Sequence, residues 1–215
     1  MPTPPLCPLF FPARPGVQVH LFGRGAAVLR GALTGPGHLI LSTAPCATLD
    51  RLCLDNQAGA SAVGGASPGG HSGHHHSSNA VRVVEGHLRL QECSITLRNS
   101  NGYACVHATG LATQLDVVGG VVRGGKNGIR YNRGAGGRVD GCLLTGAIFA
   151  GIYVWGAGSS PVVTRTAIQA CGSGVRVDAG VDADWAVGEG VVFHGCQHSI
   201  IDERASTEHM PDEDD

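Results

Sequence analysis

Apolar and polar residues alternate along most of this chain, and between Gly86 and Arg204 the alternation recurs with a period of about 24 residues. The first phrase of the repeat has an apolar residue in the same column of five successive copies, namely Leu90, Leu115, Val139, Val163 and Val187. A second phrase follows in each copy, and its column contains Val106, Ile129, Ile152, Val175 and Ile200. Two independent columns with one shared period indicate an array of structural repeats.

The local pattern within each copy is typical of β-strands. β-branched residues alternate with polar ones, glycine and asparagine separate the phrases, and no stretch has the apolar spacing of a helix. A leucine-rich repeat would need a fixed lattice of leucine and asparagine, and a propeller blade would need about 40 residues or more. The pattern therefore predicts an all-β fold in which each copy forms one coil of a parallel β-helix, with equivalent positions stacked about 4.8 Å apart.

Short phrases such as GHLRLQECSIT, NGIRY and AGIYV carry a resemblance to a known family. They resemble the PbH1 repeats of the right-handed parallel β-helix proteins of the pectin-lyase-like superfamily. They are most similar to the non-secreted β-helical domains of F-box and Shc-binding type proteins. The resemblance covers roughly residues 17–204 and implies a single-stranded, right-handed solenoid of about seven coils. It does not select an activity, because this fold occurs in lyases, hydrolases and binding domains.

The remaining segments differ from the repeats in composition. Residues 1–15 contain six of the eleven prolines and are predicted to form an extended, mobile leader before a β-helix over residues 16–204. A Gly-, Ser- and His-rich stretch at 57–78 is predicted to be a loop insertion within one coil, because it has too few apolar residues to offset the entropy of ordering. The acidic residues 205–215 are predicted to be a disordered tail.

Charge and cysteine usage narrow the class of protein. Residues 202–215 contain seven acids and one arginine, so the rest of the chain has ten of the 17 acids and fourteen of the 15 basic residues. The eight cysteines include no Cys-x-x-Cys pair, which excludes a zinc knuckle or thioredoxin motif. No secretion signal and no run of about 20 apolar residues is evident. We therefore predict an intracellular protein with reduced cysteines and no cofactor, and we expect no nucleic-acid or membrane partner.

The first candidate site is a histidine cluster at His71, His74, His75 and His76. Neutral imidazoles bind transition metals, but a specific site needs supporting hydrogen-bond partners, and this stretch offers none nearby in sequence. Acids at Asp178, Asp182 and Asp184 could suggest calcium, and a glycine-containing turn explains them equally well. We therefore expect no specific metal site.

Asp116 and Asp140 are the second candidate. Each follows an inward-facing residue of the first phrase, so the two carboxylates are expected to point outward on adjacent coils about 4.8 Å apart. That separation is close to the roughly 5–5.5 Å between the carboxyl groups of a retaining glycosidase. The sequence motifs of the polygalacturonases are otherwise missing. The alternative function is therefore a polysaccharide lyase or glycoside hydrolase acting on an anionic polysaccharide, with these two residues as its catalytic acids.

The third candidate is the row of outward residues in the second phrase, which contains Arg82, His107, Arg130, Tyr153, Arg176 and Ile201. We expect these side chains to stack as one exposed column, in which arginines on alternate coils avoid direct contact between like charges. Such a ridge could bind an extended anionic ligand or an acidic peptide. The competing interpretation is a solvated face whose arginine stems cover apolar surface.

These observations together favour a non-enzymatic interaction or substrate-recognition module. Its expected binding residues are Arg82, His107, Arg130, Tyr153 and Arg176, and its expected partner is a protein or an extended anionic ligand. The F-box resemblance implies the recruitment of protein substrates.

Overall fold

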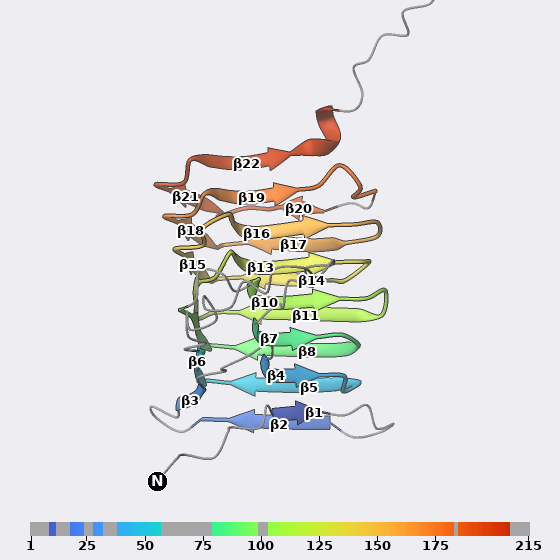
Figure 1. The fold of residues 1–215 in the computed structure, drawn as a ribbon, viewed down its shortest axis with the longest axis vertical. Coiled ribbons are helices and arrows are strands. Elements are labelled where there is room, and N and C mark those ends of the chain that lie inside the picture. Colours follow the sequence, from blue (N-terminus) through green and yellow to red (C-terminus); the bar gives the residue numbers. More distant parts are fainter. Residues whose placement is uncertain are drawn as a thin grey trace, which may run out of the picture.

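The computed structural model describes residues 9–11, 18–23, 28–31, 38–56, 79–98, 103–182 and 185–206. Their strands form three parallel sheets that wrap around one apolar core (Figure 1). Sheet A has the order β1 (Leu9–Phe11), β4 (His38–Ser42), β7 (Asn79–Val83), β10 (Ala104–Thr109), β13 (Asn127–Asn132), β16 (Ala150–Trp155), β19 (Ser173–Val177) and β22 (His198–Asp202).

The other two sheets follow the same order along the axis. Sheet B contains β2 (Gln18–Phe22), β5 (Cys46–Asp50), β8 (Gly86–Gln91), β11 (Thr113–Val118), β14 (Gly136–Asp140), β17 (Ser160–Thr164) and β20 (Ala186–Val187). Sheet C contains β3 (Val28–Gly31), β6 (Cys53–Asn56), β9 (Ser94–Leu97), β12 (Val121–Gly124), β15 (Leu143–Thr145), β18 (Ala167–Gln169) and β21 (Val192–His194). A 3-10 helix, η1 (Glu203–Ser206), follows β22.

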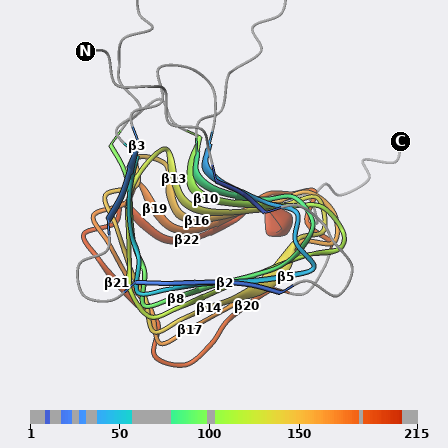
Figure 2. The ribbon, with the colours of Figure 1, turned by 90° about the horizontal axis from the view of Figure 1, so that it is seen from below.

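Each turn of the chain contributes one strand to sheets A, B and C in succession, and every strand pairs in parallel with the equivalent strand of the next coil. The cross-section is triangular, and from the N-terminal end the chain runs clockwise as it recedes, so the helix is right-handed (Figure 2). The prediction of an all-β, right-handed parallel β-helix is confirmed. About five regular turns are present, from β7 to β21, and not the seven expected, while β1–β6 extend the same sheets below them.

Stacks of identical or similar apolar residues fill the core. One inward column of sheet A consists of Val81, Val106, Ile129, Ile152 and Val175, all fully buried. Sheets B and C contribute equivalent columns, which are Leu49, Leu90, Val117, Val139 and Val163, and Leu54, Ile95, Val122, Leu144 and Ile168. Burying one such side chain contributes about 1.5–3 kcal/mol, so these columns are the main stabilising feature of the fold.

The register of the second copy differs from the sequence alignment by two residues. Val117, not Leu115, lies between Leu90 and Val139, whereas Leu115 lies opposite Leu88 and Gly137. Both Leu115 and Val117 point inward, because side chains on one strand face alternate with a period of two. The apolar pattern excludes a shift of one residue, which would reverse the faces, but it cannot exclude a shift of two.

The same correction applies to the neighbouring columns. Gly120, not Val118, is the equivalent of Cys93 and Cys142, and its φ of +85° is a conformation that favours glycine. A Cβ atom at this position would lie 2.1 Å from the carbonyl oxygen of Cys93. In sheet C, Val122 lies between Ile95 and Leu144, and Phe193 lies opposite Ile168.

The observed strands can be compared with the segment boundaries that the sequence predicts. Leu9–Phe11 pairs with β4, so sheet A begins before the expected boundary at residue 16. β6 ends at Asn56 and β7 begins at Asn79, so the expected insertion connects sheet C to sheet A. Residues 57–78 of that insertion and residues 207–215 of the expected tail lie outside the described residues, as do the predictions made for them.

Candidate ligand-binding face

The outer face of sheet A brings together all five residues of the expected binding column. Parallel pairing places Arg82, His107, Arg130, Tyr153 and Arg176 opposite one another on β7, β10, β13, β16 and β19, with Ile201 next on β22. We call these side chains the first row. The expectation that this row is exposed is wrong at its centre, because only 5% of His107 and 4% of Arg130 is exposed.

A second outward row lies two residues further along the same strands, as the alternation of a strand requires. It consists of Val84, Thr109, Asn132, Trp155, Asp178 and Glu203. Two residues of the first row, Tyr153 and Arg176, contact the second-row residue of the next coil. The hydroxyl of Tyr153 donates to Oδ2 of Asp178 at 3.3 Å, and the guanidinium of Arg176 forms an ion pair with Glu203.

Aromatic rings surround the central arginine. The guanidinium carbon of Arg130 lies 4.0 Å from the ring centre of Tyr103, 5.2 Å from that of Tyr153 and 5.0 Å from that of Trp155. Cation–π contacts of this kind contribute about 0.5–2 kcal/mol each, more where water is excluded. The rings thus hold the position of the guanidinium, but they do not supply a negative charge.

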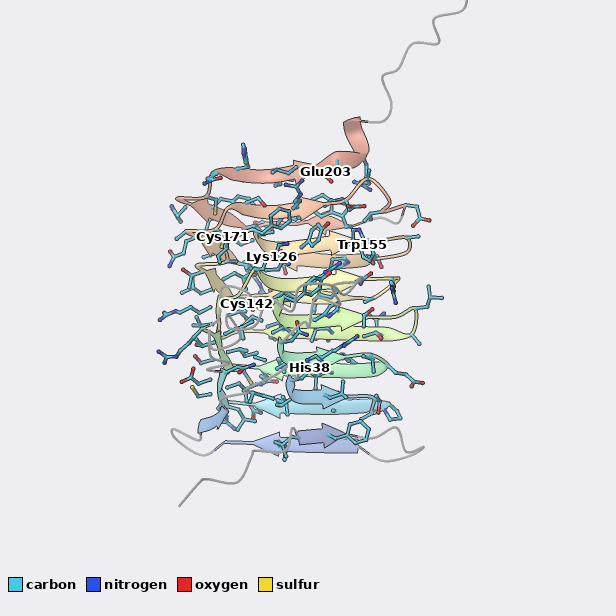
Figure 3. The ribbon with its side chains drawn as sticks, viewed as in Figure 1. His38, Lys126, Cys142, Trp155, Cys171 and Glu203 are labelled. Carbon is cyan, nitrogen blue, oxygen red and sulfur yellow. The ribbon has the colours of Figure 1, made fainter. Side chains whose placement is uncertain are left out.

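The same pattern of cations and rings continues up the face. The guanidinium of Arg176 lies 4.6 Å from the ring centre of Phe149, and the ammonium of Lys126 lies 5.5 Å from the same ring. Figure 3 labels His38 near the lower end of the molecule, Lys126 and Trp155 above it at similar heights, and Glu203 near the upper end. The face is therefore an aromatic and cationic surface several coils long.

The lower part of the face has unpaired polar atoms. Nε of Arg82, Nε of Arg130 and both ring nitrogens of His107 are buried and have no hydrogen-bond partner in the part of the chain that the structure describes. The described contact of Arg82 is a long one, 3.4 Å from its Nη1 to Nε2 of His38. Within the described ranges, no carboxylate lies within ion-pair distance of any of these three first-row residues. The charge of Asp178 favours the ionised form of Arg130, but among the described residues neither Arg82 nor Arg130 forms an ion pair.

Burial and like charges set the electrostatics of this region. Burial, followed by the charges of Arg82 and other nearby bases, lowers the pKa of His107 from 6.5 to about 3. Burial and Arg82 lower the pKa of His38 to about 4. Burial also lowers the pKa of Arg130 to about 10, which leaves it charged at neutral pH. The pattern is typical of a site in which positive charge is unfavourable until an anion arrives.

The two candidate carboxylates do not face each other. Asp116 lies opposite Arg89 and Arg138, whereas Asp140 lies opposite Val118 and Thr164. The expected 4.8 Å pair rested on the register that placed Leu115 beside Val139, and the two-residue correction removes it. The geometry of a retaining glycosidase is therefore not present at these two residues.

The partners of the two acids indicate structural roles. Nε of Arg165 donates to Asp140 at 2.8 Å and the hydroxyl of Thr164 donates at 2.9 Å, and these hydrogen bonds lower the pKa of the buried carboxyl to about 2. Asp116 accepts a hydrogen bond from the backbone N–H of Arg138 at 3.2 Å, and Nε2 of His87 lies 3.2 Å from its other oxygen. Both carboxylates bridge neighbouring coils, and a carboxyl group with a pKa near 2 is a poor proton donor.

Metal ligands do not gather within the described residues, where no group of three or more His, Cys, Asp or Glu side chains could hold an ion. Asp178 accepts from the backbone N–H of Gly180 at 3.0 Å, and Asp182 accepts from that of Gly158. Asp184 and the cluster of His71, His74, His75 and His76 lie outside the described residues. The seven described cysteines are free thiols, including Cys171 and Cys196 on consecutive coils.

The sequence pattern did not single out His38, Tyr103, Phe149 and Trp155, which the structure adds to the face. A usable signal was present, because the chain has only two tryptophans, three tyrosines and five phenylalanines. Trp155 also stands two residues after Tyr153, where alternation along a strand returns a side chain to the same face. Tyr103 and Phe149 precede their strands, so their contacts depended on the turns.

Comparisons of the chain with protein-family models, curated proteins and solved structures found no match. Among the described residues, no helix has the length and apolar character needed to cross a membrane. The function is therefore inferred from the fold and from the chemistry of its faces.

Proposed function

We propose that this protein is a non-enzymatic binding module that holds an anionic partner on the outer face of sheet A. The observation that supports the proposal is Arg130, which is 4% exposed, carries a positive charge and has no anionic partner among the described residues. A buried charge that lacks its partner typically costs about 3–5 kcal/mol. Folded proteins retain such a cost where a ligand or partner offsets it.

The neighbours of Arg130 support the same role. Arg82 adds a second positive charge two coils earlier, and His107 between the two arginines is a neutral imidazole at neutral pH because its pKa is about 3. The rings of Tyr103, Tyr153 and Trp155 hold the Arg130 guanidinium in place. A preorganised donor loses little conformational freedom when its partner binds. The face thus combines fixed donors, positive charge and aromatic surface, which is a combination enriched at interaction hot spots.

The resemblance of the repeats suggests a finer assignment. The phrases resemble PbH1 repeats of the pectin-lyase-like superfamily and, within it, the β-helical domains of F-box type proteins. We propose on that basis that the module recruits a protein, within the cell, through this face. The alternative, an enzyme acting on an anionic polysaccharide, has less support because Asp116 and Asp140 do not form a pair and both are engaged between coils.

Binding of a panel of polyanions, with titration calorimetry at several salt concentrations, tests the proposal. The panel contains poly-aspartate, inorganic polyphosphate and oligogalacturonate. The double variant Arg82→Ala/Arg130→Ala should lower the affinity for at least one polyanion by tenfold or more and flatten its salt dependence. Arg123→Ala, which removes an exposed arginine from sheet C, is the matched control and should change the affinity less than twofold.

Two results would contradict the proposal. Equal affinities for the parent protein and the double variant would show that the polyanion does not bind on this face. Cleavage of oligogalacturonate that disappears in Asp116→Asn or Asp140→Asn would replace the module with the enzyme.

A further inference from the structure

We infer that the anionic partner is a carboxylate-rich polypeptide segment of another protein, and that it lies along Val84, Thr109 and Asn132 of the second row. The inference rests on the proposed function and specifies the chemistry and the position of the ligand. Its starting point is a difference between the two ends of one face, which share a backbone register but have different charges.

The upper end of the face already contains its own carboxylates. Asp178 accepts the hydroxyl of Tyr153 and Glu203 pairs with Arg176, so each first-row side chain there meets an acid from the second row of the next coil. These contacts are an internal template for how a first-row cation or donor is satisfied. In both contacts the acid is the residue that directly follows a strand of sheet A, Asp178 after β19 and Glu203 after β22 at the start of η1.

The lower end has the same geometry without the acids. By the same register, Thr109 is the second-row residue on the coil after Arg82, and Asn132 is the second-row residue on the coil after His107. The Arg82 side chain itself contacts His38 on the preceding coil. Neither Thr109 nor Asn132 carries a charge. The lower end therefore has neutral side chains at the second-row positions where the upper end has the carboxylates of Asp178 and Glu203. A segment lying over Thr109 and Asn132 would bring carboxylates to those positions.

The unpaired atoms also distinguish a polypeptide from a simple polyanion. Among the described residues, Nε of Arg82 and Nε of Arg130 are donors without acceptors, whereas Oδ1 of Asn132 and Oδ1 of Asn127 are buried acceptors without donors. Phosphate and sulfate polymers offer acceptors alone at neutral pH. A polypeptide offers carboxylates to the arginines and backbone N–H groups to the amide oxygens, so it satisfies both kinds of atom.

The rings point to the same ligand class. The Arg130 guanidinium lies over the rings of Tyr103, Tyr153 and Trp155, and its Nε has no acceptor among the described residues, where a planar carboxylate is the acceptor that fits a guanidinium best. The same rings and Val84 provide apolar area for the aliphatic parts of a peptide. The charge asymmetry of this chain, with basic residues concentrated outside positions 202–215, leaves the face complementary to an acidic segment.

The test uses the full chain and a synthetic decapeptide of alternating Glu and Val, and binding is followed by calorimetry and by tryptophan fluorescence, to which Trp155 and Trp185 both contribute. The matched probe replaces each Glu with Gln. We expect the acidic peptide to bind at least tenfold more tightly than its Gln counterpart and to change the tryptophan emission. Arg130→Met, which keeps the aliphatic stem and removes the charge, should lower the affinity for the acidic peptide at least tenfold.

A variant that carries its own carboxylate in the second row tests whether the peptide binds at that row. Asn132→Asp is nearly isosteric and should place a carboxylate beside His107 in the manner of the upper end. We expect it to raise the His107 pKa, measured by NMR of the imidazole, and to weaken peptide binding at least fivefold. Gln114→Glu adds the same charge on the outer face of sheet B and should change neither quantity. Circular dichroism confirms that each variant remains folded.

The remaining outcomes separate this inference from the proposed function. Binding of polyphosphate or oligogalacturonate that depends on Arg130, with no binding of the acidic peptide, would overturn the peptide assignment and leave an anion-binding face. If the protein binds no polyanion at all, both the peptide assignment and the proposed anion-binding function are wrong. Much tighter peptide binding by a chain with Asp212→Asn, Glu213→Gln, Asp214→Asn and Asp215→Asn would show that the chain's own acidic residues compete, which would overturn the assignment to a separate partner.

Discussion

The upper and lower ends of the outer face of sheet A are built on the same backbone and differ in chemistry. The upper end, over β16, β19 and β22, pairs Tyr153 and Arg176 with Asp178 and Glu203. The lower end, over β7, β10 and β13, has Arg82, His107 and Arg130 without a carboxylate among the described residues. A solenoid gives both ends one geometry, so the difference shows that neutral residues in the second row leave the lower cations unpaired.

The largest effect should come from breaking the scaffold that the two ends share. Ile152 is fully buried between Ile129 and Val175, at the level where the upper end meets the lower. Ile152→Asp would bury an unpaired charge at a cost of several kcal/mol. We expect cooperative unfolding in denaturant to be lost or strongly weakened. A melting curve like that of the parent protein would mean that this position is not in the core.

The second prediction concerns pH and belongs to the lower end alone. His107 and His38 have folded pKa values of about 3 and about 4, below the unfolded value of 6.5. The unfolded state therefore binds more protons below pH 6.5, and stability should fall as the pH decreases from 6.5 toward these values. Between pH 6.5 and 5 the loss should reach about 2 kcal/mol for each histidine.

Urea unfolding at pH 7 and at pH 5, above the range where most carboxylates titrate, measures this effect. His107→Gln should remove about half of the difference, whereas Gln at the exposed His198 should leave it as in the parent protein. An unchanged pH dependence in His107→Gln would show that the imidazole is not held neutral by its surroundings.

The third prediction compares two arginines of the same row. Arg130→Met removes a buried charge that has no partner, and replacing such ions with apolar groups is often neutral or stabilising by about 1–4 kcal/mol. Arg176→Met instead leaves Glu203 without its ion pair and should cost about 0.2–1 kcal/mol, because both side chains are partly exposed. Thermal unfolding should therefore move in opposite directions. If both variants shift Tm in the same direction, the two arginines do not differ in their ion pairing as described for the two ends.

The smallest effect should come from making the upper end resemble the lower. Glu203→Gln releases Arg176 and changes stability by less than about 1 kcal/mol. The cationic row then gains a free member, so the affinity for the acidic peptide should rise by about two- to fivefold. Calorimetry at low salt, where such a difference is easiest to resolve, provides the measurement. A lower affinity would indicate that Glu203 itself contributes to the binding surface.

The comparison of sequence and structure shows where pattern analysis succeeds. The columns through Ile129 and Ile152 were predictable, because stacked coils require similar apolar residues at one period and those residues are fully buried. The same logic located the first row, since its members are the polar neighbours of that column. The register around Leu115 was not predictable, because two inward residues on one strand satisfy the alternation equally well.

The amino-acid sequence by itself determined the solenoid, its period and the choice of first-row residues, because these follow from the periodic placement of apolar side chains. The tertiary structure alone decided which polar groups meet. It separated Asp116 from Asp140, placed Arg165 on Asp140, and enclosed Arg130 between rings of the coil before it and the coil after it. Contacts across coils depend on register, turns and side-chain direction, and these are set by packing of the whole array and not by the local alternation that the sequence displays.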